Sequence, residues 1–156
     1  MFKLTHWTMD EDEETNIYPN FHYGATFYPK ILSHAIKTQR IEESDVHKLL
    51  LIKKFEFSSE LQRMSVVVRN NIDREILCYI KGSPESIQSL CDEESIPKNY
   101  SEQLDNYTSR GFRVIALAYR TLNMDESDFD DNVEREKIER VSSSVRIENS
   151  FNLFIC

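Results

Sequence analysis

Glycine is scarce in this sequence. Only 3 glycines occur among its 156 residues, and none lies in a GxxxxGK[ST] or GxGxxG loop. The two glycine-rich loops that most often hold phosphates are therefore absent. If the chain binds a nucleotide, it does so with another kind of site.

Long apolar runs and an excess of positive charge are also missing. No apolar run approaches the ~18–20 residues of a membrane-spanning helix. The 19 Lys and Arg residues face 27 Asp and Glu residues, which gives a formal net charge of −8. Because nucleic acids and anionic membranes require a basic surface, we expect no nucleic-acid binding and no membrane contact by this chain. A bound nucleotide is compatible with this charge, since one or two local cations suffice to make a cleft positive.

The cysteines and histidines indicate neither a disulfide framework nor a metal site. The 3 cysteines form no CxxC pair, which is typical of reduced thiols. The 4 histidines are never spaced three or four residues apart, so we predict no protein metal site. The acidic residues 125–131 lack the glycine and the closing glutamate of a calcium-binding loop, and we interpret them as a solvated loop.

Strand-like segments dominate the middle of the chain. The length favours one domain with a real core. Connections of hairpin length favour an antiparallel meander, and we predict the fold class as α+β, a mainly antiparallel β-sheet flanked by helices. Strands are predicted over residues 49–57, 63–69, 75–81 and 112–119, with a short further strand within 21–29.

Helices are predicted between and after these strands. Ser83 has the features of an N-cap, with Pro84 as the first helical residue, and this helix is expected to end near Cys91. A second helix is predicted around residues 100–110, with Gly111 as its C-cap. Weaker patterns indicate a helix tail over 1–7, a helix over 31–40, a flexible acidic loop over 123–132 and a solvated helix over 134–140.

Three separated segments carry residue types that suit a nucleotide. Phe57 offers an aromatic face for a base, although a buried core position is the alternative. Lys81 ends a strand and can reach phosphate oxygens, while Gly82 lets backbone approach a ligand closely. An ordinary turn with a solvated lysine explains the same two residues. Arg113 can pair with phosphate in a bidentate way, or it faces solvent or a carboxylate.

Three further residues near Phe57 have two interpretations each. Arg63 can contact phosphate, or it is an ordinary exposed arginine of a hairpin. Ser59 and Gln62 can donate hydrogen bonds to a ligand, or they only stabilise the turn.

Taken together, these segments resemble the nucleotide-binding (N) domain of P-type ATPases. The matching residues are 57–67 (FSSELQRMSVV), 81–85 (KGSPE) and 111–118 (GFRVIALA). The SSELQRMSV form and the serine of KGSPE are closest to the type 5 subfamily and its B branch, which comprises eukaryotic endolysosomal-type cation and polyamine transporters.

The resemblance covers residues 1–122, with His6 in place of a family glycine, and returns at 134–139. It implies an N-terminally truncated nucleotide-binding domain over 1–140. The divergent tail, 141–156, is expected to be poorly ordered.

The resemblance implies a role for each matched residue. Phe57 would stack on the adenine, Lys81 would line the base and phosphate pocket beside Gly82, and Arg113 would contact the phosphates.

Around Phe57 the sequence departs from the calcium-pump pattern. Ser59 and Gln62 stand where those relatives have basic residues, and Arg63 is a candidate replacement cation. The acidic residue that approaches the adenine amino group would lie before Met1.

The resemblance also implies what the parent protein does. Its nucleotide-binding domain binds Mg-ATP and presents the γ-phosphate to an aspartate on a separate phosphorylation domain, and an actuator domain is the further partner. This occurs on the cytoplasmic side of a membrane, here an endolysosomal or other endomembrane, and drives cation or polyamine transport. The phosphorylated-aspartate motif is absent from this sequence, so we expect no catalysis by this chain alone. The alternative is a truncated, non-binding interaction domain derived from such a pump.

Overall fold

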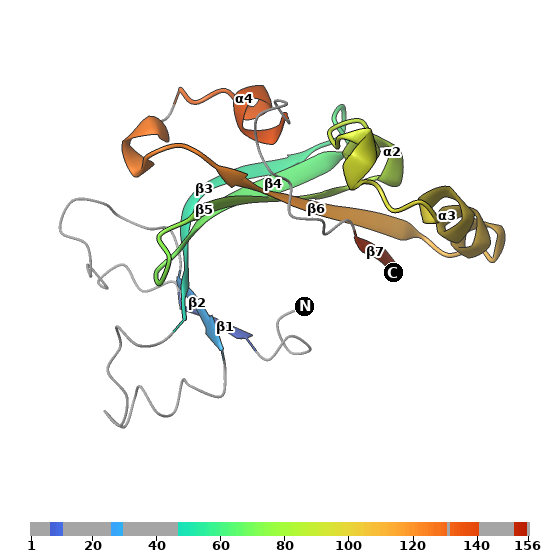
Figure 1. The fold of residues 1–156 in the computed structure, drawn as a ribbon, viewed down its shortest axis with the longest axis horizontal. Coiled ribbons are helices and arrows are strands. Elements are labelled where there is room, and N and C mark those ends of the chain that lie inside the picture. The colour runs from blue at the N-terminus through green and yellow to red at the C-terminus, as the bar shows by residue number, and fades with distance from the viewer. Residues whose placement is uncertain (1–6, 11–25, 30–46, 131, 141–151, 156) are drawn as a thin grey trace.

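The fold is built on one antiparallel sheet whose seven strands follow one another in chain order (Figure 1). The computed structural model describes residues 7–10, 26–29, 47–130, 132–140 and 152–155. The strands are β1 (Trp7–Asp10), β2 (Thr26–Pro29), β3 (Leu49–Ser58), β4 (Arg63–Asn70), β5 (Ile76–Gly82), β6 (Val114–Leu122) and β7 (Asn152–Ile155).

The four central strands were predicted to within a few residues, and the α+β class with a mainly antiparallel sheet is confirmed. The short strand expected before residue 29 is β2. Trp7 begins β1, so the helix tail predicted there is wrong at that residue. Four residues of the tail expected to be poorly ordered form β7, which pairs with β6. The helix predicted over 31–40 lies outside the described residues.

Short helices connect the strands after β5. In Figure 1, α2 and α4 lie over the same face of the sheet, and α3 lies beside the beginning of β6. The helical elements are α2 (Pro84–Gln88), η3 (Glu93–Ser95), α3 (Tyr100–Ser109), η4 (Glu126–Asp128) and α4 (Arg135–Glu139).

The core lies between the sheet and the two helices α2 and α4. Ile87 of α2 and Ile138 of α4 are fully buried and belong to the same apolar cluster as Val67, Cys78 and Ala116 of the strands. Alternate residues of a strand point to opposite faces of a sheet. The other face therefore carries the neighbours of these residues, which are mostly half-buried, although Val68 is buried.

The ends of α2 and α3 follow the predicted capping chemistry. The Ser83 hydroxyl accepts a hydrogen bond from the Ser86 amide at 3.2 Å, and Pro84 begins α2. The helix ends at Gln88, three residues before the predicted end. Gly111 follows α3 with a φ of 80°, a left-handed conformation in which glycine avoids the strain of a side chain.

Two segments expected to be solvated are each anchored to the core by buried residues. The helix predicted over 134–140 is α4, but Ile138 and Glu139 are fully buried, so the prediction of a solvated helix is wrong. The acidic segment 123–132 contains η4, whose Asp125 and Asp128 form a capping box. Phe129 follows η4 and is only 7% exposed, which fixes this segment to the core.

Candidate functional site

A cavity of about 480 Å³ lies where the β3–β4 turn meets the end of β5 and the beginning of β6. Its lining residues come from all four central strands and the turns beside them, because β3, β4, β5 and β6 pair side by side. The lining residues are Phe57, Gln62, Met64, Lys81, Gly82, Ser83, Arg113, Val114 and Ile115.

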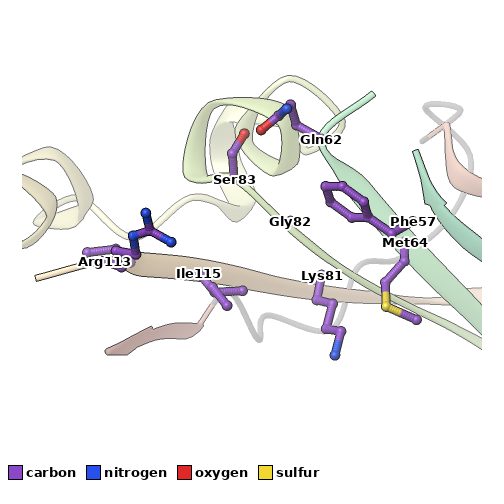
Figure 2. Close-up of a pocket in the computed structure, with 9 residues that line it drawn as sticks. Phe57, Gln62, Met64, Lys81, Gly82, Ser83, Arg113 and Ile115 are labelled. Carbon is purple, nitrogen blue, oxygen red and sulfur yellow. The ribbon is translucent and has the colours of Figure 1, made fainter. Parts of the chain in front are cut away.

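The structure brings five of the seven predicted site residues to this cavity. In Figure 2, Phe57 and Met64 lie at one end and Arg113 at the other, with Lys81 between them. The fourth and fifth predicted residues are Gln62 and Gly82. Residues far apart in the sequence therefore converge at one place.

Phe57 is an exposed aromatic side chain, not a core residue. It is 57% exposed and stands near the end of β3. The apolar cluster of the core includes Phe55 as a packed neighbour but not Phe57. Most phenylalanines are buried for packing, so an exposed one is unusual. Because its ring lies open at a cavity, Phe57 can contact a ligand there.

Gly82 gives the backbone of the β3–β4 turn room to approach β5. A Cβ on Gly82 would lie 2.5 Å from the carbonyl oxygen of Gln62 and 2.6 Å from Cβ of Arg63. The Ser83 amide also donates a hydrogen bond to the Gln62 carbonyl at 3.0 Å. The glycine is thus required by chain packing at the cavity wall, whether or not a ligand is present.

The β3–β4 turn holds Gln62 at the cavity in an unusual backbone conformation. Gln62 has a φ of 54°, and its amide donates to the Ser58 carbonyl at 2.7 Å. Its side-chain amide donates to the Ser59 carbonyl at 2.8 Å. Ser59 itself is exposed and is not among the residues that line the cavity.

Arg63 lies on the opposite face of the sheet from the cavity. Met64 lines the cavity, and neighbouring residues of a strand point to opposite faces. Arg63 is therefore directed towards α4, where its Nε donates to Glu139 Oε2 at 2.7 Å. Its side chain is 11% exposed, so the alternative of an ordinary exposed hairpin arginine is wrong, and Arg63 is not among the residues that line the cavity.

The cavity is a local positive site on a negatively charged chain. Lys81 and Arg113 are the two cationic residues that line it, and no acidic residue appears among its described lining. The chain as a whole has a formal net charge of −8. An anion is therefore favoured here over the rest of the surface, because fixed cations set the local potential in a cleft.

The sequence analysis missed the apolar part of the wall. Met64 pairs in register with Lys81 and faces the same side, and Ile115 lies between Lys81 and Arg113 in Figure 2. Met64 and Ile115 belong to motifs already noted, but only strand register shows which face they occupy. A smaller cavity of about 180 Å³ shares Met64 and Lys81 with the larger one and is also lined by Tyr79 and Leu117.

Nucleophilic and metal chemistry find no support among the described residues. Burial raises the pKa of the Cys78 thiol to about 12, with the Glu139 charge as a further cause. Burial likewise raises the pKa of Cys91 to about 11. The described part of the chain holds no group of three or more His, Cys, Asp or Glu side chains placed to bind a metal ion. The two cations and the aromatic and apolar side chains of the cavity suit an anion with an apolar or aromatic part.

The chain belongs to the family of the P-type ATPase cytoplasmic domain N, whose model matches residues 31–145. The match covers the whole cavity and the four central strands. It confirms the resemblance that the motifs around Phe57, Lys81 and Arg113 indicated.

Similar proteins include P-type ATPases of the 13A group, which confirms the type 5 prediction. The chain is 37% identical over 139 residues to the mouse "Probable cation-transporting ATPase 13A5", covering 89% of this chain and 11% of that protein. It is 38% identical over 130 residues to the human "Polyamine-transporting ATPase 13A3", covering 78% of this chain and 11% of that protein. It is 32% identical over 153 residues to the "Vacuolar cation-transporting ATPase YPK9" of Saccharomyces cerevisiae, covering 89% of this chain and 10% of that protein.

The chain spans about a tenth of the length of these relatives. Among the helices of the described residues, none has the length and apolar character needed to cross a membrane.

Proposed function

We propose that this chain binds Mg-ATP in the cavity and presents the γ-phosphate to an aspartate on a separate phosphorylation domain. One observation carries the proposal: an exposed aromatic ring and two cations line one cavity whose described lining holds no acidic residue, in a domain of the P-type ATPase N family. A ring of this kind can stack on a base, and lysine and arginine bind phosphate oxygens. The volume of about 480 Å³ falls within the usual range for small-molecule sites.

The arrangement suggests how the nucleotide lies. Phe57 stacks on the adenine, and the thioether of Met64 contacts the base from the same end of the cavity. Lys81 reaches the base and the phosphates, and Arg113 at the far end pairs with phosphate oxygens. Gln62 supplies a hydrogen bond at the wall. The Mg²⁺ ion enters with the phosphates, as it does in most nucleotide sites.

We propose that the parent protein is a cation pump that couples ATP hydrolysis to transport across a membrane. The names of these relatives support a cation as the cargo, with polyamines as the candidate, and an endomembrane such as the vacuolar one as the location. The chain then works on the cytoplasmic side of that membrane, together with the phosphorylation and actuator domains. ATP binding by the chain itself is the part that can be tested directly.

The test is a titration of the chain with Mg-ATP, followed by amide NMR shifts. Saturable shifts are expected near Phe57, Lys81 and Gly111. We expect weak binding, because a small number of contacts must offset the loss of ligand freedom. Base stacking contributes roughly 1–3 kcal/mol, and each 1.4 kcal/mol corresponds to about a tenfold change in affinity. Phe57→Ala should weaken binding by that amount.

Two variants control for effects of truncation. Phe57→Trp keeps an aromatic face and should retain most of the affinity. Ile72→Ala truncates another exposed apolar residue, 63% exposed, in the turn at the other end of β4, and should leave the affinity unchanged. Unchanged affinity in Phe57→Ala would remove Phe57 from the site. The absence of saturable shifts at millimolar Mg-ATP would instead favour the non-binding interaction domain.

A further inference from the structure

A buried ionic network joins α4 to the beginning of β4 on the face of the sheet opposite the cavity. The Glu139 carboxylate is fully buried and accepts three hydrogen bonds. Arg63 Nε and Arg135 Nε each donate to it at 2.7 Å, and the Ser65 hydroxyl donates at 2.6 Å. Because the carboxylate is satisfied on both oxygens, both arginine side chains are held in fixed positions.

Arg135 extends this network to both arms of the β3–β4 hairpin. Its NH1 donates to the carbonyl of Glu56 at 3.0 Å, and its NH2 donates to the carbonyl of Arg63 at 2.9 Å. The pairing of β3 with β4 is irregular between Phe55 and Ser58, so the Glu56 bond stabilises the hairpin where its own ladder is interrupted. The planar guanidinium makes these bonds while its Nε stays on Glu139.

The two carbonyls bracket the turn that forms one wall of the cavity. Glu56 precedes Phe57 near the end of β3, and Arg63 follows Gln62 of the turn, so the bonds lie immediately outside these two cavity residues. We propose that Arg135, oriented by Glu139, is a positioning residue that sets Phe57 and Gln62 against Lys81 for nucleotide binding. This role rests on the proposed ATP site, although Arg135 itself does not line the cavity.

The first measurement needs no nucleotide. Hydrogen exchange of the 156-residue chain is followed by NMR at the Gln62 and Ser83 amides, which donate to Ser58 and Gln62 within the wall. Arg135→Gln should accelerate exchange at these two amides by about tenfold or more, because it removes hydrogen bonds from a charged donor. Exchange at the Cys78 amide, in the middle of the sheet, should change no more than it does in the control variant Lys137→Gln.

The second measurement is the affinity for Mg-ATP of the same variants. Arg135→Gln should lower the affinity about three- to tenfold, since Phe57 and Gln62 are no longer held in place. Lys137→Gln is the matched control, because it removes one positive charge from an exposed position of the same helix. Arg135→Lys keeps the charge but lacks the planar fork, so it should restore little of the affinity.

Three results would overturn the inference. Equal exchange at Gln62 and Ser83 in Arg135→Gln and Lys137→Gln would show that Arg135 does not hold the wall. Equal acceleration at Cys78 would show a general loss of stability. Wild-type affinity in Arg135→Gln, with a loosened wall, would show that the position of the wall does not matter for binding. If wild-type chain binds no Mg-ATP, the proposed function and the nucleotide role fail together, while the exchange result still decides whether Arg135 holds the hairpin.

Discussion

Gly82→Ala tests whether the cavity wall depends on contact between two backbone segments. The added Cβ would lie 2.5 Å from the Gln62 carbonyl oxygen, 2.6 Å from Arg63 Cβ and 2.9 Å from Arg63 Cα. Two of these atoms belong to the backbone and cannot rotate away. The β3–β4 turn must therefore move off β5, and the hydrogen bond from the Ser83 amide to Gln62 is weakened with it.

The opposing effects can be compared by size. Overpacking lowers the free energy of unfolding by about 1–3 kcal/mol, and a weakened hydrogen bond by about 0.5–1.5 kcal/mol. Alanine restricts the unfolded chain, which raises the free energy of unfolding by about 0.4–1 kcal/mol. The steric effect prevails, so we expect a net loss of about 1–3 kcal/mol. In urea this lowers the unfolding midpoint by about 1 M, since the slope is typically about 1–3 kcal/mol per molar.

The assay is urea unfolding followed by circular dichroism, with Gly111→Ala and Gly111→Asn for comparison. A Cβ on Gly111 meets no atom within 4 Å, but its φ is 80°, so Gly111→Ala loses about 1–2 kcal/mol through backbone strain alone. Asparagine relieves that strain, whereas Gly82→Asn should be at least as damaging as Gly82→Ala. A Gly82→Ala midpoint at or above the wild-type value would refute the steric reasoning.

Two more predictions concern buried side chains. Phe129→Ala should lower the free energy of unfolding by about 3–5 kcal/mol in the same urea assay, because this ring anchors the acidic segment in the core; a loss no larger than that of Phe112→Ala, whose ring is 38% exposed, would contradict that role. Burial raises the pKa of Cys78 from 9.0 to about 12, so the folded state keeps a proton that the unfolded state loses, and stability should decline between pH 9 and 12. The decline should be shallower in Cys78→Ala, and identical slopes for the two proteins would show that the thiol does not contribute.

Local patterns predicted the central strands and the beginning of α2. Val66, Val67 and Val68 give β4 its β-branched strand character, and Ser83 with Pro84 marks the start of a helix by local capping chemistry alone. The motifs around Phe57, Lys81 and Arg113 also identified residues that meet at one cavity. Signals of this kind lie within a few neighbouring residues, which is why sequence was sufficient for them.

Long-range pairing could not be predicted in the same way. Arg63 meets Glu139 across 76 positions, and nothing near either residue indicates its partner. The charges of 134–140 indicated a solvated helix, because a buried glutamate and an exposed one look alike in sequence until their partners are known. Strand register likewise decided that Met64 faces the cavity and Arg63 faces away from it.

The order of the strands has a consequence for the assembly of the cavity during folding. Neighbours in the sheet are neighbours in the chain, so β3, β4 and β5 can pair through short hairpin loops that close early. β6 reaches β5 only after residues 83–113 have been traversed, the longest connection between neighbouring described strands. Closing this connection costs more chain entropy than closing either hairpin loop. Arg113 therefore joins Phe57 and Lys81 last, and the cavity is complete only when the central sheet is.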